Sequence, residues 1–147
     1  MVKILVKKFD NKIKLPVYKT SGSSGMDLMA YVKNKINIKP GKTAMIPTGI
    51  AVAIPKNYEI QIRPRSGLAA KKCISVLNTP GTIDSDYRGE IKIILINLCK
   101  KSFVVRSGDR IAQMVLCPIV KGKFKQVKIL PKTIRGKGGF GSTGKNN

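Results

Sequence analysis

The chain has no histidine and no tryptophan, and only seven of its 147 residues are acidic. Histidine is the commonest zinc ligand and the usual general base near neutral pH, so its absence argues against a zinc site. It also leaves only a carboxylate, a lysine or a tyrosine to act as a general base. We therefore expect any hydrolysis by this protein to depend on a carboxylate.

Long apolar runs are missing as well. The longest strongly apolar run, Ile93-Ile-Leu-Ile96, is far too short to cross a bilayer, and the first residues lack the charged-then-apolar pattern of a signal segment. The three cysteines, Cys73, Cys99 and Cys117, are widely spaced and include no Cys-x-x-Cys motif. This pattern favours free thiols in a reduced setting, so we expect a cytoplasmic location.

Positive charge, in contrast, is abundant, with a formal net charge of +22. Most of the 29 cationic side chains are lysines scattered along the chain, and only six are arginines. Lysine is a point charge on a flexible stem, whereas the planar guanidinium of arginine suits phosphate or carboxylate. Each arginine lies in or near a glycine-containing turn. This indicates that the arginines occupy specific functional or structural positions, whereas the lysines reflect the general composition of the chain. The charge by itself also permits weak, non-specific nucleic-acid contact.

The sequence predicts one all-β domain of short strands separated by turns. Several segments alternate apolar and polar residues, as in Tyr58-Glu-Ile-Gln-Ile-Arg63, and turn pairs such as Pro40-Gly41 separate them. This spacing favours a β-sandwich or jelly roll with one short helix, at Ser66–Lys72. The expected strands are residues 2–9, 27–32, 36–39, 45–54, 59–63, 74–77, 90–98, 111–119 and 124–130.

One expected strand is apolar on both faces, through Ile93 to Ile96. Such a strand is either a central strand buried on both sides or a strand that also lines a subunit interface. The sequence favours neither reading over the other.

The C-terminal residues differ in character from the rest. Over residues 135–144, five of ten residues are glycine, so this stretch cannot pack a core. The lone aromatic residue among them, Phe140, has nothing nearby in the sequence to bury against. We therefore expect a β-domain over residues 1–132 and, over residues 133–147, a flexible flap that orders over a ligand.

Five segments combine turn glycines with charged or hydroxyl residues, and five of the seven acids fall within them. In order, spacing and content, these segments resemble the five motifs of the trimeric dUTP nucleotidohydrolases (dUTPases), over residues 24–144. The segments are Ser24-Gly-Met-Asp-Leu-Met-Ala30, Arg63-Pro-Arg-Ser-Gly-Leu-Ala69, Asn78-Thr-Pro-Gly-Thr-Ile-Asp-Ser-Asp-Tyr-Arg-Gly-Glu-Ile91, Gly108-Asp-Arg-Ile-Ala-Gln113 and the glycine-rich tail.

The resemblance implies a homotrimer of jelly-roll subunits of the β-clip type, in which each active site takes motifs from all three chains. It implies hydrolysis of dUTP to dUMP and pyrophosphate, with Mg²⁺ bridging the phosphates. Such an activity supplies dUMP for thymidylate synthesis and keeps uracil out of DNA.

Two of the motifs are expected to handle the phosphates and the metal. By the resemblance, Asp27 holds Mg²⁺ through water, which suits an ion that tends to keep its own waters. Arg65, Ser66, Gly67 and Gln113 match the residues that contact the phosphates. For Ser66 the simpler reading is a helix N-cap, and for Asp27 it is a turn aspartate bonded to its own backbone.

The third motif is expected to supply the water-activating group and the base reader. Asp84 matches the carboxylate that orients and activates the attacking water, and Tyr87 matches the aromatic ring under the deoxyribose. Asn78, Gly81 and Ile83 match the hairpin that reads uracil and excludes a thymine methyl group.

The tail is expected to close over the nucleotide. Phe140 matches the ring that stacks on uracil, and Arg135 matches a catalytic donor to the phosphates. Gly141, Ser142 and Thr143 match neighbouring contacts that close with it. The remaining charged residues of the motifs are expected to be structural, through turn hydrogen bonds and ion pairs: Asp86, Arg88, Glu90, Asp109 and Arg110.

Two other functions are compatible with parts of this pattern. A dCTP deaminase would share the fold and substrate shape, but its second motif has an Arg-Ser-Ser pattern, whereas this chain has Pro64-Arg-Ser-Gly-Leu68. A non-enzymatic nucleic-acid-binding protein would need aromatic residues interleaved with basic ones on one surface. The chain has only eight aromatic residues, and two of them are assigned to the site.

Overall fold

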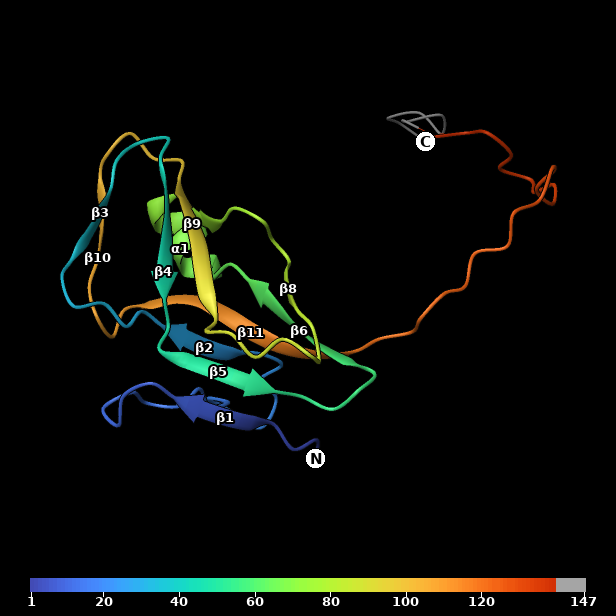
Figure 1. Ribbon diagram of the computed structural model, residues 1–147. Coiled ribbons are helices and arrows are strands. Elements are labelled where there is room, and N and C mark those ends of the chain that lie inside the picture. Colours follow the sequence, from blue (N-terminus) through green and yellow to red (C-terminus); the bar gives the residue numbers. More distant parts are fainter. Residues whose placement is uncertain (140–147) are drawn as a thin grey trace.

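The computed structural model describes residues 1–139, which form eleven short strands and one helix (Figure 1). The all-β fold with a single short helix is therefore confirmed. No helix in this part of the chain has the length and apolarity needed to span a membrane. The elements are β1 (Leu5–Lys8), β2 (Met26–Met29), β3 (Ile36–Ile38), β4 (Thr43–Pro47), β5 (Ile50–Ala53), β6 (Tyr58–Arg63), α1 (Ser66–Lys72), β7 (Ile74–Val76), β8 (Gly81–Ile83), β9 (Lys92–Asn97), β10 (Phe103–Val105) and β11 (Arg110–Pro118).

The strands form four antiparallel sheets around one core. The largest has the order β2-β11-β6-β8, and a second has the order β4-β9-β7. Figure 1 shows β4 and β9 running across the direction of β11. Two further pairs, β1-β5 and β3-β10, complete the body.

Period-two alternation explains which residues enter the core. In β6, Ile60 and Ile62 are buried while Gln61 is half-exposed and Arg63 is exposed. In the facing sheet, Ile93 and Leu95 of β9 are almost completely buried. Side chains on alternate positions of a strand point to opposite faces, so each strand contributes one row to the shared core.

Three strand predictions were wrong in detail. Residues 45–54 form two strands rather than one, because Gly49 adopts a left-handed conformation (φ 70°) that turns the chain between β4 and β5. Two short strands, β8 and β10, fell in segments that were expected to be turns and loops. At three residues each, they are too short for alternation to reveal them.

The strand predicted at residues 124–130 is also absent. After β11 the chain leaves the body as an extended arm, residues 119–139, shown in orange to red in Figure 1. Its backbone is tied to the body through Ile119, whose N–H donates to the carbonyl of Asn57 at 2.9 Å. A strand needs the edge of another strand to pair with, and this arm meets none within one chain. Its large apolar side chains are exposed: Val120, Phe124, Val127, Ile129, Leu130 and Ile134.

The strand β9 is central in its sheet but is not buried on both faces. Its outer face carries Ile94 and Ile96, which are half-exposed, and its neighbour Met45 on β4 is 58% exposed. Within one chain, therefore, the first of the two readings for this strand is wrong. The outer face of the β4-β9-β7 sheet is apolar and open.

Candidate active site

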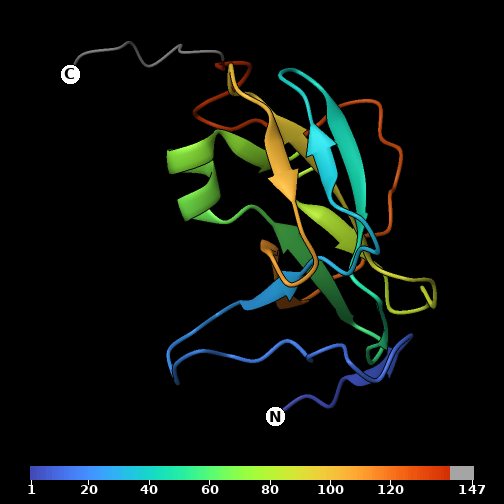
Figure 2. The same ribbon diagram turned by 90° about the vertical axis from the view of Figure 1, so that its left-hand side faces the viewer.

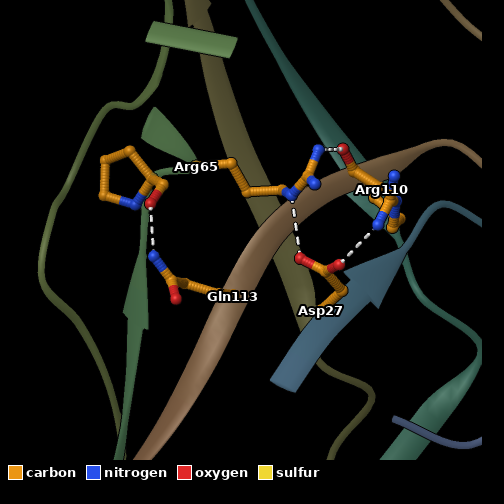
Figure 3. Close-up of polar contacts among 5 residues, drawn as sticks. Asp27, Arg65, Arg110 and Gln113 are labelled. Atoms are coloured by element: carbon orange, nitrogen blue, oxygen red, sulfur yellow. Dashed lines mark hydrogen bonds and ion pairs between the residues drawn. The ribbon is translucent and has the colours of Figure 1, made fainter. Parts of the chain in front are cut away.

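The strongest polar cluster of the molecule joins Asp27 of β2 to two arginines (Figure 3). The Nε of Arg65 donates to Asp27 Oδ1 at 2.8 Å, and Nη1 of Arg110 donates to Asp27 Oδ2 at 3.1 Å. Arg65 also donates from Nη1 to the backbone carbonyl of Arg110 at 3.2 Å. The Asp27 side chain is only 20% exposed, so these charge-assisted bonds are partly shielded from water. The cluster fastens the start of α1 to β2 and β11.

The expected tying role of Arg110 is consistent with these contacts. Asp27 is more than a turn aspartate bonded to its own backbone, because both of its carboxylate oxygens receive arginine donors from elsewhere in the chain. Within residues 1–139 these are the only two ion pairs, which marks the cluster as the one place where the scarce acids meet arginine directly.

The helix α1 spans Ser66–Lys72, as predicted. Its N-cap is Arg65, in an extended conformation and without a side-chain cap bond, so Ser66 is the first helical residue rather than the cap. The simpler reading of Ser66 is therefore wrong. Ser66 and Gly67 are both exposed, and a Cβ placed on Gly67 would meet no atom within 4 Å. The hydroxyl and the backbone of this turn stand open beside Arg65.

Gln113 lies at the centre of the same region because of the strand register. On β11 it pairs with Asp27 of β2 on one side and with Arg63 of β6 on the other. Its Nε2 donates to the carbonyl of Pro64 at 3.0 Å (Figure 3). A Cβ on Gly25 would lie 2.6 Å from Gln113 Oε1, so a side chain there would displace the amide from its present position. The structure thus brings together Asp27, Arg65, Ser66, Gly67 and Gln113.

Sequence reasoning missed Gly25 and Pro64 as supports of this cluster. Gly25 stands in the first motif segment, but nothing in the pattern shows that its missing side chain accommodates Gln113. Pro64 contributes only its backbone carbonyl, which any residue would carry. Neither residue can be recognised from the sequence. Gly25 contributes by lacking a side chain and Pro64 by its backbone carbonyl, and neither carries a reactive group.

The three residues expected to read uracil lie together at β8. Asn78, Gly81 and Ile83 line a small cavity of about 50 Å³ next to Ile62 and Ile94. A Cβ on Gly81 would lie 3.2 Å from the Nδ2 of Asn78 and 3.3 Å from the Cβ of Ile62. Any larger residue at Gly81 would therefore press on the Asn78 amide. The hairpin brings these residues into one narrow space.

Asp84 and Tyr87 follow β8 in an exposed turn. The backbone N–H of Tyr87 donates to the carbonyl of Asp84 at 3.2 Å, which closes the turn. The Tyr87 hydroxyl donates to the Glu90 carbonyl at 3.0 Å, and its ring lies over Gly89, where a Cβ would collide with the phenol. The Asp84 side chain is exposed and free of protein hydrogen bonds within residues 1–139.

The neighbouring charged residues hold this turn, but through backbone hydrogen bonds. Arg88 donates from Nη1 to the carbonyls of Ser85 and Tyr87, both at 2.8 Å. Glu90 accepts a hydrogen bond from the Gly49 backbone at 2.8 Å, which ties the turn to the β4–β5 corner. The expected turn bonding is confirmed for Arg88, whereas the side chain of Glu90 bonds outside the turn. The expected ion pairs are wrong within residues 1–139, where Asp86, Arg88 and Glu90 form none.

Within one chain the outermost members of the two groups lie at opposite edges of the same sheet, whereas Gln113 lies on the inner strand β11. Asp27 is on β2 and Gly81 on β8, and the sheet order β2-β11-β6-β8 puts two strands between them. Neighbouring strands are spaced about 4.8 Å apart, so the two edges are separated by about 14 Å. The expected residues of one chain are therefore spread across the width of the sheet rather than gathered at one point.

The arm carries one of the expected tail residues. Arg135 lies in the arm, where its Nε donates to the carbonyl of Gly138 at 2.8 Å in a local turn. The other expected tail residues, Phe140, Gly141, Ser142 and Thr143, lie outside the described residues.

A cavity of about 400 Å³ lies away from these residues, between the N-terminal segment and the β2 strand. Tyr31 lines it and donates a short hydrogen bond from its hydroxyl to Asp10. This bond lowers the pKa of the Asp10 carboxyl, with help from the Lys12 backbone N–H, and raises the pKa of the Tyr31 hydroxyl. The cavity is mainly apolar and carries none of the expected site residues.

The comparisons with known proteins decide the family. The dUTPase family model matches residues 11–144. The chain belongs to the dUTPase family. The match favours a dUTPase over a dCTP deaminase or a nucleic-acid-binding protein, in agreement with the pattern of the five motifs.

Relatives with the same name cover nearly the full chain. The deoxyuridine 5′-triphosphate nucleotidohydrolase of Rickettsia bellii is 57% identical over 98% of this chain and 97% of its own length. That of Hydrogenobaculum sp. is 54% identical over 97% of this chain and 99% of its own. Among solved structures, the dUTPase of Staphylococcus bacteriophage 80alpha with dUPNHPP is 27% identical, with a TM-score of 0.84 over 97% of this chain and 98% of the phage chain.

Proposed function

We propose that this protein hydrolyses dUTP to dUMP and pyrophosphate, and so supplies dUMP and keeps uracil out of DNA. The observation that carries the proposal is the convergence of Asp27, Arg65 and Gln113 beside the open first turn of α1, in a chain of the dUTPase family. A phosphate chain needs donors held in fixed positions, and this cluster supplies them.

Arg65 and Ser66 are the proposed phosphate contacts. Arg65 donates from Nε to Asp27 and from Nη1 to the backbone carbonyl of Arg110. Its guanidinium is therefore held from two sides. A guanidinium fixed in this way loses little freedom when it binds an anion. Ser66 adds a hydroxyl donor in the same turn, and the free Oε1 and remaining N–H of the Gln113 amide can contact the phosphates or their waters.

Asp84 is the proposed water-activating carboxylate. Its exposed oxygens can accept a proton from water and aim that water at a phosphorus atom. A carboxylate is a weak base, so alignment and charge stabilisation by the phosphate-binding groups supply most of the rate. The chain offers no histidine to compete for this role.

The β8 hairpin is the proposed reader of base and sugar. In this proposal the strand offers backbone donors and acceptors to the edge of uracil, and the narrow space lined by Asn78, Gly81 and Ile83 supports the exclusion of a thymine methyl group. Tyr87, fixed through its hydroxyl to the Glu90 carbonyl, stands where a ring can stack under deoxyribose and exclude a 2′-hydroxyl.

We propose further that the active protein is a homotrimer with sites shared between chains. Three observations support this assembly. Asp27 and Gly81 lie at opposite edges of one sheet, the outer face of the β4-β9-β7 sheet is apolar, and the arm, whose large apolar side chains are exposed, extends away from the body (Figure 1). Such surfaces are normally covered by a partner.

The arm also fits the proposed division of the chain into a β-domain over residues 1–132 and a flap over residues 133–147. In this proposal the flap brings Arg135, Phe140 and the segment Gly141–Thr143 to a site on another chain. Closure of the flap would expel water and add donors around the phosphates.

Mg²⁺ is the proposed metal, in a water-mediated role. Among residues 1–139, no three Cys, Asp or Glu side chains gather closely enough to hold a metal ion directly. Each carboxylate oxygen of Asp27 accepts one hydrogen bond from an arginine. Each oxygen therefore has a lone pair left that can accept a hydrogen bond from a metal-bound water. This donor set fits an ion held mainly by the phosphates. When bound, Mg²⁺ would neutralise phosphate charge.

Pyrophosphate release tests the proposed reaction. The purified protein should release pyrophosphate from dUTP far faster than from dTTP, UTP or dCTP, and Mg²⁺ should raise the rate. Equal rates on dUTP and dTTP would contradict the proposed base reader, and ammonia release from dCTP would contradict the reaction itself. Removal of residues 134–147 should leave a folded trimer with severely reduced turnover, which separates the flap from the rest of the proposal.

The bulk properties fit this function only in part. The three cysteines are free, as suits a cytoplasmic location, which we retain as part of the proposal. The comparisons give no support to the nucleic-acid contact that the net charge suggested.

A further inference from the structure

Two cysteines that are distant in the sequence meet at one end of the β4-β9-β7 sheet. Cys73 ends the helix α1 and Cys99 follows β9. The antiparallel register pairs Ile74 with Asn97, and the backbone N–H of Leu98 donates to the carbonyl of Cys73 at 3.0 Å. The two cysteines are therefore neighbours across the end of a strand ladder.

Cys73 occupies an unusual backbone position for a residue with a side chain. Its φ of 51° and ψ of 34° place it in the left-handed region, and its N–H donates to the carbonyl of Ala69 at 3.1 Å to close the helix. Glycine or asparagine normally fills this position, because a Cβ makes the conformation costly. A cysteine there lies beside the start of the β9–β10 turn, because its carbonyl accepts the Leu98 N–H. Strain of this kind is a reason to look for a role for the side chain.

Cys99 is held in place by a buried asparagine. The Oδ1 of Asn97 accepts a hydrogen bond from the Cys99 backbone at 2.9 Å, and its Nδ2 donates to the carbonyls of Ile38 and Lys101 at 2.8 and 2.9 Å. Asn97 is completely buried. The backbone of the turn that carries Cys99 is thus fixed next to the end of the strand ladder where Cys73 lies.

The two thiols influence each other directly and sit in a cationic setting. Backbone N–H donors of Lys101 and Lys100, the neighbouring Cys73 thiol and the Lys101 charge lower the pKa of Cys99. The proximity of Cys99 raises the pKa of Cys73. One cysteine is therefore the better thiolate and the other remains a thiol, an asymmetry typical of an attacking and a resolving pair.

We propose that Cys73 and Cys99 form a peroxide-sensitive thiol pair that closes to an intrachain disulfide. The Cys99 thiolate attacks one oxygen of a hydroperoxide, the O–O bond breaks, and the leaving oxygen departs as water or an alcohol after taking up a proton. The Cys73 thiol, on losing its proton, then attacks the sulfur of the Cys99 sulfenic acid and releases water. Two thiols are oxidised, and one peroxide is reduced.

Access and position set this pair apart from the third cysteine. Cys73 is exposed and Cys99 is half-exposed, so a small peroxide can reach them. Cys117 lies on β11, where its Sγ is 3.8 Å from the carbonyl of Val115 and 3.9 Å from Nη2 of Arg63, with no second thiol among its contacts. Only the first pair combines two thiols, a fixed turn and neighbouring positive charge.

The disulfide would stiffen a helix that the fold holds loosely. No residue of α1 is fully buried, and Figure 2 shows the helix at the edge of the body rather than between the sheets. The bond would join its C-terminal end to the β9–β10 turn, while its other end carries Arg65 and Ser66. Oxidation should therefore raise the melting temperature and reverse on reduction.

Mass spectrometry after treatment of the fully reduced protein with hydrogen peroxide tests the proposal. The chain should lose the mass of two hydrogen atoms, and a non-reducing tryptic digest should contain residues 73–88 joined to residues 93–100. The Cys117 peptide, residues 111–121, should stay free. C117S should react like the wild type, and dithiothreitol should restore the original mass.

Two variants test which of the two cysteines attacks the peroxide first. In Cys73→Ser, the sulfenic acid on Cys99 should persist and be trapped by dimedone, whereas Cys99→Ser should react far more slowly. Cys73 reacting in Cys99→Ser at the wild-type rate would overturn the order of attack. A bond between chains, a bond that includes Cys117 or the absence of any disulfide would overturn the proposal.

Discussion

Asp27 holds Arg65 by a 2.8 Å bond from Nε to Oδ1 and so joins the edge strand β2 to the first turn of α1. The same carboxylate receives Arg110 on its other oxygen. The orientation of one proposed phosphate-binding arginine thus depends on an acid that touches no phosphate itself. This dependence can be measured.

Asp27→Asn should weaken substrate binding without unfolding the protein. The amide keeps the size of the side chain, but it removes the charge and offers only one acceptor oxygen to two guanidinium groups. We expect a loss of about 1–3 kcal/mol in stability and a clear rise in KM for dUTP. Asp86→Asn is the matched control, because that exposed carboxylate forms no ion pair within residues 1–139. An unchanged KM in Asp27→Asn would show that Arg65 needs no such support.

Asp84→Asn should abolish most turnover while leaving the fold and dUTP binding intact. The exposed side chain makes no protein hydrogen bond that the substitution could break, whereas an amide cannot take a proton from water. A positioned general base typically contributes at least about a hundredfold in rate, so kcat should fall by about that factor or more. Single-turnover pyrophosphate release and equilibrium binding separate the two effects. Hydrolysis near the wild-type rate would remove Asp84 from the proposed mechanism.

Asn97→Ala should be among the more destabilising single substitutions in the β-domain. It removes three hydrogen bonds from a completely buried site and leaves the carbonyls of Ile38 and Lys101 without their donor. We expect a loss of about 2–4 kcal/mol in the free energy of unfolding. Asn37→Ala, at an exposed position on β3, should change it by less than about 0.5 kcal/mol. Chemical denaturation of both variants checks the contrast.

The bond between Tyr31 and Asp10 should contribute stability only between two pH limits. The folded-state pKa of Asp10 is lowered below 3.8, so its contribution is present above that value and is lost as the pH falls through the folded pKa. The pKa of Tyr31 is raised above 10.0, so its contribution is present below that value and is lost as the pH rises through the folded pKa. Both limits describe one bond, from a neutral phenol to an ionised carboxylate.

Melting curves over a range of pH test this assignment. The wild type should melt above Tyr31→Phe from about pH 5 to about pH 9, and the difference should shrink on both sides of that range. Tyr18→Phe serves as the control because Tyr18 is 50% exposed and has no hydrogen-bond partner for its hydroxyl within residues 1–139. A constant difference at every pH would point to packing rather than to the hydrogen bond.

Much of the fold could be predicted because its strands carry their own pattern. The alternation in residues 58–63 places Ile60 and Ile62 inside, and β6 was predicted to within one residue. The helix Ser66–Lys72 has the bounds that the sequence indicated. The prediction of a strand at residues 124–130 was wrong. Alternation shows that one face of a segment is apolar, but a strand forms only where that face packs against other residues, and one chain provides no such surface here within residues 1–139.

The site was predictable as a set of residues but not as an arrangement. The motif segments identified Asp27, Arg65 and Gln113, because charged and amide groups near glycine turns are distinctive in an acid-poor chain. Their mutual geometry depends on register: Gln113 faces Asp27 only because β11 pairs with β2 at that position. Likewise, no local pattern shows that Gly25 must be small so that the Gln113 amide can lie against it.

The two edges of the β2-β11-β6-β8 sheet have a genetic consequence if the proposed shared sites hold. A chain with a defect at Asp84 still carries an intact Asp27 edge, and a chain with a defect at Asp27 still carries an intact β8 hairpin. When the two defective chains are made in one cell, some mixed trimers would combine the intact Asp27 edge of one chain with the intact β8 hairpin of the other. Two alleles that each inactivate the enzyme alone could then complement one another, whereas two alleles at the same edge could not.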